Sequence, residues 1–155
     1  MSKTGANLFN HISQVGFVVR DLEKTRETML RVFEREPDKV LHLPTDGIKY
    51  YGSDGDFTAV IAFYFFGDTQ LEFIQPLSGK SIWQDFLDQG KEGLHHIRFS
   101  VESFSGARDF MDGKGVPISQ EGFSALVPGL RWAYFDSEEP LGFIFEMFNE
   151  HEKKV

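Results

Sequence analysis

Hydrophobic and polar residues follow the same order of patterns twice along the chain. In the first half, His11 to Val19 alternates between apolar and polar residues, as a half-buried strand does. Asp21 suits a helix N-cap, and apolar residues then recur at helical spacing to about Glu34, shortly before Pro37. Further strands are predicted at Val40 to Leu43, Phe57 to Phe66 and, after a Gly67-Asp68 turn, Gln70 to Leu77.

The second half repeats this order after a connector that holds a short helix at about Ile82 to Leu87. A strand is predicted at Leu94 to Val101 and a helix at Ser103 to Lys114, closed by Gly115. Three more strands complete the pattern: Val116 to Gln120, Arg131 to Asp136 and Phe143 to Asn149. The segment EEPLG is predicted as a turn between the last two. The order is β-α-β-β-β twice, with about eight strands, which predicts an α+β fold.

The length of 155 residues fits one domain, which we predict over residues 1–155. Module 1 is expected at about 9–77, the connector at about 78–92 and module 2 at about 93–150. A net charge of −8 argues against nucleic acid and anionic membranes as partners, because both attract basic surfaces. The chain has no cysteine, no apparent signal peptide and no apolar run long enough to span a bilayer, so a cytoplasmic location is expected.

Four residues form the most informative set: His11, Glu72, His96 and Glu146. Each lies in a predicted strand, and each half supplies one histidine and one glutamate. Two imidazoles and two carboxylates can form a site for a divalent metal. A carboxylate between apolar strand neighbours is costly to bury unless it is paired or bound to a metal, although either glutamate could instead face solvent.

Several stretches carry a family resemblance: FNHISQVGFVVRDLEKTRETM, DTQLEFIQPL, KEGLHHIRFSVES and GFIFEMF. The chain resembles the vicinal oxygen chelate superfamily and, within it, the methylmalonyl-CoA epimerases. The resemblance implies paired βαβββ modules that form a U-shaped, barrel-like mixed sheet around one divalent ion per chain. It implies His11, Glu72, His96 and Glu146 as the metal ligands. His95 should face the other side of its strand, while His42 and His151 are expected on the surface.

The same resemblance implies a reaction in which a proton leaves a carbon next to a thioester or carbonyl. A base is then needed on each face of the planar intermediate. An ungapped count back from Glu72 puts Asp56 at the position of one epimerase base, and Glu146 is the candidate for the second. Asp56 could also be replaced by a water or be an ordinary turn residue. The metal could be cobalt, nickel, manganese, zinc or magnesium.

Two other functions remain open at this stage. A glyoxalase I-like lactoylglutathione lyase would use a similar ligand set, whereas a dioxygenase would use two histidines and one carboxylate. A non-catalytic drug-binding protein of the same fold would use aromatic residues, and 17 phenylalanines with Trp83, Trp132 and Tyr134 would suit it. The expected partners are a small-molecule substrate, with an acyl-CoA as one candidate, and a second copy of the chain in a homodimer.

Overall fold

The computed structural model describes residues 8–43 and 47–149, which contain ten strands and four helices. The first half forms β1 (Ile12–Val18), α2 (Leu22–Phe33), β2 (Lys39–Leu43), β3 (Lys49–Tyr50), β4 (Ser53–Asp54), β5 (Thr58–Phe66) and β6 (Thr69–Ser78). After α3 (Ile82–Asp88), the second half forms β7 (Gly93–Val101), α4 (Phe104–Gly113), β8 (Ile118–Phe123), β9 (Arg131–Phe135), α5 (Glu138–Leu141) and β10 (Ile144–Asn149). None of the helices in these described ranges is long and apolar enough to cross a membrane.

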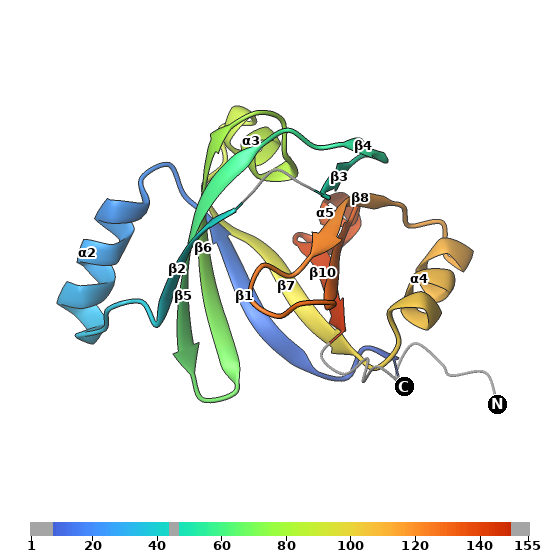
Figure 1. Ribbon diagram of the computed structural model, residues 1–155, viewed down its shortest axis with the longest axis horizontal. Helices are drawn as coiled ribbons and strands as arrows, with labels where there is room; N and C mark the ends of the chain where they lie inside the picture. The colour runs from blue at the N-terminus through green and yellow to red at the C-terminus, as the bar shows by residue number, and fades with distance from the viewer. Residues whose placement is uncertain (1–7, 44–46, 150–155) are drawn as a thin grey trace.

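All ten strands belong to one mixed sheet in the order β2-β5-β6-β1-β7-β10-β9-β8-β3-β4. The two halves meet where β1 pairs antiparallel with β7. On either side of this seam, the last strand of each half runs parallel to the first, β6 beside β1 and β10 beside β7. The sheet curls into a half-barrel, with α2 and α4 outside its two arms and α3 at one end (Figure 1). The α+β fold predicted from the sequence is therefore confirmed.

Helix α2 begins where its sequence signals predicted. The Asp21 carboxylate accepts a hydrogen bond from the Lys24 backbone N–H at 3.0 Å, which caps the first turn. Leu22 and Met29 face the outer side of the sheet and pack in a cluster with Tyr64 and Phe73. Burial of one such side chain stabilises the fold by about 1.5–3 kcal/mol, and this fixes which face of β5 and β6 is left for the interior.

Two local features differ from the sequence analysis. The Gly-rich stretch before β5, for which no strand was predicted, forms the β3–β4 hairpin, and β3 pairs with β8 of the second half. Tyr50 also joins β3 to α3, because its hydroxyl donates to Asp85 at 2.8 Å. Burial and the Asp85 carboxylate together raise the pKa of Tyr50 to about 12. The EEPLG turn is the one-turn helix α5, which ends at Gly142 with a positive φ of 78°.

Candidate active site

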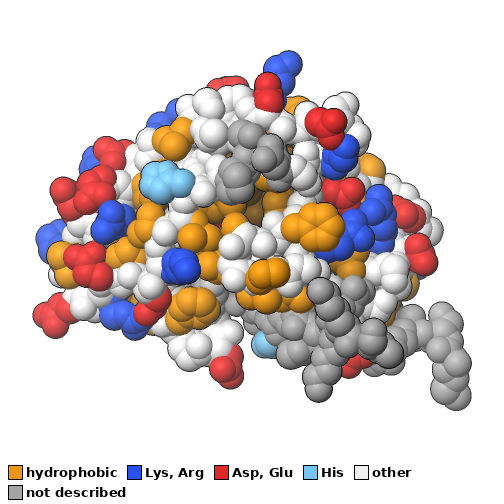
Figure 2. Space-filling model, viewed as in Figure 1, with side chains coloured by type: hydrophobic (Ala, Val, Ile, Leu, Met, Phe, Trp, Pro, Cys, Tyr) orange, Lys and Arg blue, Asp and Glu red, His pale blue; other side chains and the backbone are white. Residues whose placement is uncertain are grey.

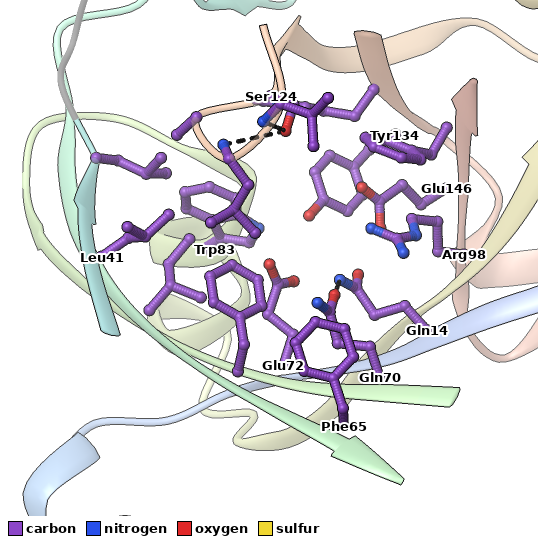
Figure 3. Close-up of a pocket in the computed structure, with 18 residues that line it drawn as sticks. Gln14, Leu41, Phe65, Gln70, Glu72, Trp83, Arg98, Ser124, Tyr134 and Glu146 are labelled. Carbon is purple, nitrogen blue, oxygen red and sulfur yellow. Dashed lines mark hydrogen bonds between the residues drawn. The ribbon is translucent and has the colours of Figure 1, made fainter. Parts of the chain in front are cut away.

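The central strands around the seam turn one set of polar side chains into the curled sheet. Side chains on a strand alternate between faces, so residues two apart share a side. Strand β1 contributes Gln14 and Gly16, β6 contributes Gln70 and Glu72, and β7 contributes His96 and Arg98. Glu146 follows on β10, in register with Arg98 on one side and Tyr134 on the other. The interior of the sheet therefore has a polar floor at the junction of the two halves (Figure 3).

Three oxygen atoms surround one nitrogen of His96. Its Nε2 lies 3.0 Å from Gln14 Oε1, 3.1 Å from Glu72 Oε2 and 3.2 Å from Glu146 Oε2. His96 is fully buried, and the two carboxylates are only 6% and 4% exposed. Turning the Gln14 amide over would bring its nitrogen within 3.0 Å of Glu146 and 3.2 Å of Glu72. We call Gln14, Glu72, His96 and Glu146 the polar cluster.

The position of His96 depends on a glycine in the neighbouring strand. Gly16 is paired with both His96 and Glu72 in the sheet register. A Cβ atom at residue 16 would lie only 1.9 Å from Cε1 of His96, closer than any non-bonded contact allows. The imidazole therefore lies over the bare backbone of Gly16, and only glycine permits this arrangement.

Burial dominates the electrostatics of the polar cluster. It raises the pKa of Glu72 to about 7 and that of Glu146 well above its ordinary value, with the positive charge of Arg98 working against both increases. Burial, followed by the charge of Arg98, lowers the pKa of His96 to about 3, so the imidazole is neutral near pH 7. A carboxyl group with a pKa of about 7, such as Glu72, is suited to accept and return a proton near neutral pH.

The polar cluster lies at one end of a cavity of about 220 Å³. Its walls are largely apolar, and Figure 2 shows hydrophobic side chains inside the hollow on this face of the molecule. The aromatic residues singled out in the sequence, Trp83, Trp132 and Tyr134, all line the cavity. Three of the 17 phenylalanines also line it: Phe63, Phe65 and Phe148.

The structure brings together three of the four predicted ligands, Glu72, His96 and Glu146, but not His11. His11 precedes β1 and is exposed, and in its place Gln14 reaches the cluster. The two residues are three positions apart, so alternation along a strand turns them to opposite faces. The sequence did contain a signal for this face. Gln14 lies two residues before Gly16, whose missing side chain makes room for His96.

Asp56, the predicted base, lies on the surface between β4 and β5 and is not among the residues that line the cavity. The ungapped count assumed a continuous strand, but β5 begins at Thr58 and its pairing with β6 has an irregularity at Thr58 and Ala59. Among the described residues that line the cavity, those with a carboxyl group are Glu72 and Glu146.

The other histidines take different positions. His95 is 1% exposed, packs edge-on against Phe86 and has its Nδ1 atom 3.0 Å from Nδ1 of His96. Burial lowers the pKa of His95 well below its ordinary value, so it also is neutral. His42 is exposed on β2, as expected. The expectation for His151 falls outside the described residues.

Within the described ranges, no group of three or more His, Cys, Asp and Glu side chains is arranged as a metal site. The donor chemistry of the polar cluster, however, fits a divalent cation. Two buried carboxylates, an amide oxygen and a neutral imidazole are all ligand types for such ions. With its amide turned over, Gln14 donates to both carboxylates. With the amide oxygen facing inward, three oxygens converge on one point, where a positive charge would stabilise them.

The chain belongs to the glyoxalase/bleomycin resistance protein/dioxygenase superfamily, because the model of that family matches residues 13–134. Within it, the chain is similar to the mitochondrial methylmalonyl-CoA epimerase of Mus musculus, with 28% identity over 97 residues. The match covers 62% of this chain and 48% of the mouse protein, so the chain spans about half the length of that relative.

Solved structures share the fold at lower identity. A methylmalonyl-CoA epimerase variant of Streptomyces coelicolor in complex with 2-nitronate-propionyl-CoA has a TM-score of 0.69 and 18% identity, covering 92% of this chain and 94% of that one. The Mycobacterium tuberculosis methylmalonyl-CoA epimerase reaches a TM-score of 0.71 with 15% identity and coverages of 97% and 95%. A hypothetical protein from Bacillus halodurans has a TM-score of 0.71, 20% identity and coverages of 94% and 97%.

Proposed function

We propose that this protein is a metal-dependent isomerase that moves a proton at a carbon next to a thioester or carbonyl, in the manner of a methylmalonyl-CoA epimerase. The observation that carries the proposal is the pair of buried carboxyl groups, Glu72 and Glu146, which lie 3.1 Å and 3.2 Å from the same His96 nitrogen at the polar end of an apolar cavity. The similarity to methylmalonyl-CoA epimerases supports the class of reaction.

The two carboxylates come from different halves of the chain, Glu72 from β6 and Glu146 from β10 (Figure 3). Epimerisation requires a proton to leave one face of a carbon and return to the other. We assign one carboxylate to each face. In the ion-free site, burial raises the pKa of both carboxyl groups, that of Glu72 to about 7. A bound cation lowers the pKa of a carboxylate that coordinates it, so the carboxylate that accepts the proton is one released from the ion.

Gln14, Glu72, His96 and Glu146 would hold one divalent ion. When bound, such an ion acts as a Lewis acid and stabilises the negative charge that develops on the substrate oxygens. His96 contributes as a neutral imidazole, and Gly16 keeps its ring in position. The apolar walls keep bulk water away from the developing negative charge, which strengthens the electrostatic interactions at this point.

The proposal is tested by incubating the protein, reconstituted with each candidate metal, with one epimer of methylmalonyl-CoA in deuterated water. We expect the other epimer to form and deuterium to appear at the α-carbon. If no metal-loaded sample incorporates deuterium, the epimerase assignment is wrong. The hemithioacetal of methylglyoxal and glutathione is then the next substrate to test, because a glyoxalase I-like lyase also moves a proton beside a carbonyl.

A further inference from the structure

Arg98 is a cation inside a mostly apolar cavity. It follows His96 by two residues on β7 and is the cationic residue among the described residues that line the cavity. Its Nε donates to Ser13 Oγ at 3.0 Å, and its guanidinium carbon lies 4.4 Å from the centre of the Phe148 ring. These contacts fix the plane of the guanidinium. No described carboxylate forms an ion pair with it. Its Nη1 lies 3.2 Å from the Gln14 amide, and the N–H groups beyond these contacts are available for an anion.

Trp83 provides a second donor, whose hydrogen bonding is incomplete. Its side chain is 2% exposed and lines the same cavity, and its Nε1 faces the Tyr134 hydroxyl without a hydrogen bond of normal geometry. In Figure 3 the indole nitrogen is turned toward the middle of the cavity, with Glu72 between Trp83 and Arg98 in that view. The other tryptophan, Trp132, differs, because its Nε1 donates to the Phe123 carbonyl at 3.1 Å. A buried N–H whose one neighbouring acceptor is poorly placed is costly, so an oxygen of a ligand near Trp83 would complete its hydrogen bonding.

The size and walls of the cavity limit what can occupy it. The cavity volume of about 220 Å³ lies below the roughly 300–1,000 Å³ of pockets that bury a drug-sized ligand. A ligand enclosed there is therefore small, and of a coenzyme A thioester only the acyl part would fit. The apolar part of the lining includes aliphatic and aromatic side chains: Leu41, Leu43, Ile61, Phe63, Leu126 and Trp132. A methyl group would leave most of this apolar surface without contacts.

We propose that the cavity selects an acyl group or free acid with three features. Its carboxylate pairs with Arg98, a second oxygen accepts the Trp83 N–H, and its apolar substituent is about the size of a phenyl ring. This inference rests on the proposed function, since it places the carbon between the two oxygens next to Glu72 and Glu146. It adds Arg98 and Trp83 as residues that determine specificity.

The first test is calorimetric titration of the purified wild-type protein with benzylmalonate, methylmalonate and 3-phenylpropionamide. Burying a phenyl ring instead of a methyl group should make benzylmalonate bind at least about 10-fold more tightly than methylmalonate. The uncharged amide should bind at least about 10-fold more weakly than benzylmalonate. Equal affinity for the acid and the amide, or tighter binding of methylmalonate, would overturn the proposal.

The second test uses matched variants. Arg98→Met should abolish the preference for benzylmalonate over the amide. Arg131→Met should keep it, because Arg131 stacks on Phe104 in the same way, at 4.2 Å, but does not line the cavity. Trp83→Phe should weaken the binding of benzylmalonate more than the binding of 3-phenylpropionate, which has one carboxylate fewer. If Arg98→Met retains the preference, the ligand is held by another group, such as a bound metal, and the proposal is wrong.

These measurements separate the inference from the proposed function. If Arg98-dependent binding of benzylmalonate occurs but methylmalonyl-CoA gains no deuterium, the binding inference stands and the epimerase proposal fails. If methylmalonyl-CoA exchanges its proton and binding is independent of Arg98, the reverse holds. Should Arg98→Met fail to fold, as judged by thermal unfolding, the wild-type series alone decides the matter.

Discussion

The two halves of the sheet contribute equal numbers of residues to the polar cluster, but they do so with different chemistry. The first half supplies Gln14 and Glu72, an amide and a carboxylate, from β1 and β6. The second half supplies His96 and Glu146 from β7 and β10. The first strand of one half carries the imidazole, whereas the first strand of the other carries an amide and the glycine that makes room for it. A repeated fold therefore specifies positions, and the residue types at those positions differ between the halves.

Removing the amide of the first half should have the largest effect on metal binding. If Gln14 is a ligand, Gln14→Ala should weaken divalent-metal affinity by at least about 10–100-fold, the cost of losing even an outer-shell partner. His11→Ala should leave the affinity nearly unchanged, because His11 is exposed and lies outside the cluster. Elemental analysis and competition with a chelator measure both variants.

The opposite result is equally informative. Loss of metal in His11→Ala together with full retention in Gln14→Ala would restore the ligand set predicted from the sequence, and it would require β1 to shift its register.

The glycine at the seam should control stability and the position of His96 together. Gly16→Ala places a Cβ against the imidazole, and overpacking of this kind costs about 1–3 kcal/mol. Gly113→Ala is the matched control, because residue 113 lies in α4 with open space around it. That change should stabilise the protein by about 0.4–1 kcal/mol. Thermal unfolding that shows the same sign for both variants would contradict the packing at the seam.

The smallest predicted effect is a dependence of stability on pH in chelator-treated protein. The pKa of Glu72 rises from 4.5 to about 7 on folding, so the folded state retains a proton that the unfolded state has lost. This contribution to stability is present below about pH 4.5 and disappears as the pH rises through about 7. The lowered pKa of His96 acts in the opposite direction, because its contribution is lost as the pH falls from 6.5 toward about 3.

A single substitution separates the two contributions. Glu72→Gln removes only the carboxylate. The free energy of unfolding of this variant should therefore increase relative to that of the wild type as the pH rises from about 4.5 to about 7. Denaturant titrations at several pH values measure the difference. A constant difference between the two proteins over this range would show that Glu72 does not titrate as its burial indicates.

Most of the fold could be predicted from the sequence, because the local signals for helices, strands and turns agree with the pattern of buried residues. The Asp21 cap, the Gly67 hairpin and the alternating strands all occur within a residue or two of their expected positions. Glu72 and Glu146 could be identified because a carboxylate between apolar strand residues requires a compensating partner. The β3–β4 hairpin could not be predicted, because its pairing with β8 depends on a contact between distant parts of the chain.

Two predicted site residues, His11 and Asp56, lie outside the polar cluster for related physical reasons. His11 was chosen from its place in the first predicted strand and from the family resemblance, yet the inward face of β1 is set by its packing against β7 and includes a register shift between Ile12 and Gln14. Asp56 was chosen by counting along a strand that begins only at Thr58. In the sequence, Gln14 does not differ from any other polar residue. Its place in the polar cluster can be recognised only in the structure, where side chains from four strands meet.

The most direct test of the central claim is to follow each epimer of methylmalonyl-CoA in deuterated water with Glu72→Gln, Glu146→Gln and Asp56→Asn. If each half supplies the base for one face, either glutamine variant should epimerise about 10²–10⁴-fold more slowly than the wild type. Each should still exchange deuterium into one epimer without inverting it, and the preferred epimer should differ between the two. Asp56→Asn should epimerise at nearly the wild-type rate. Wild-type rates in both glutamine variants, or loss of activity only in Asp56→Asn, would contradict the account.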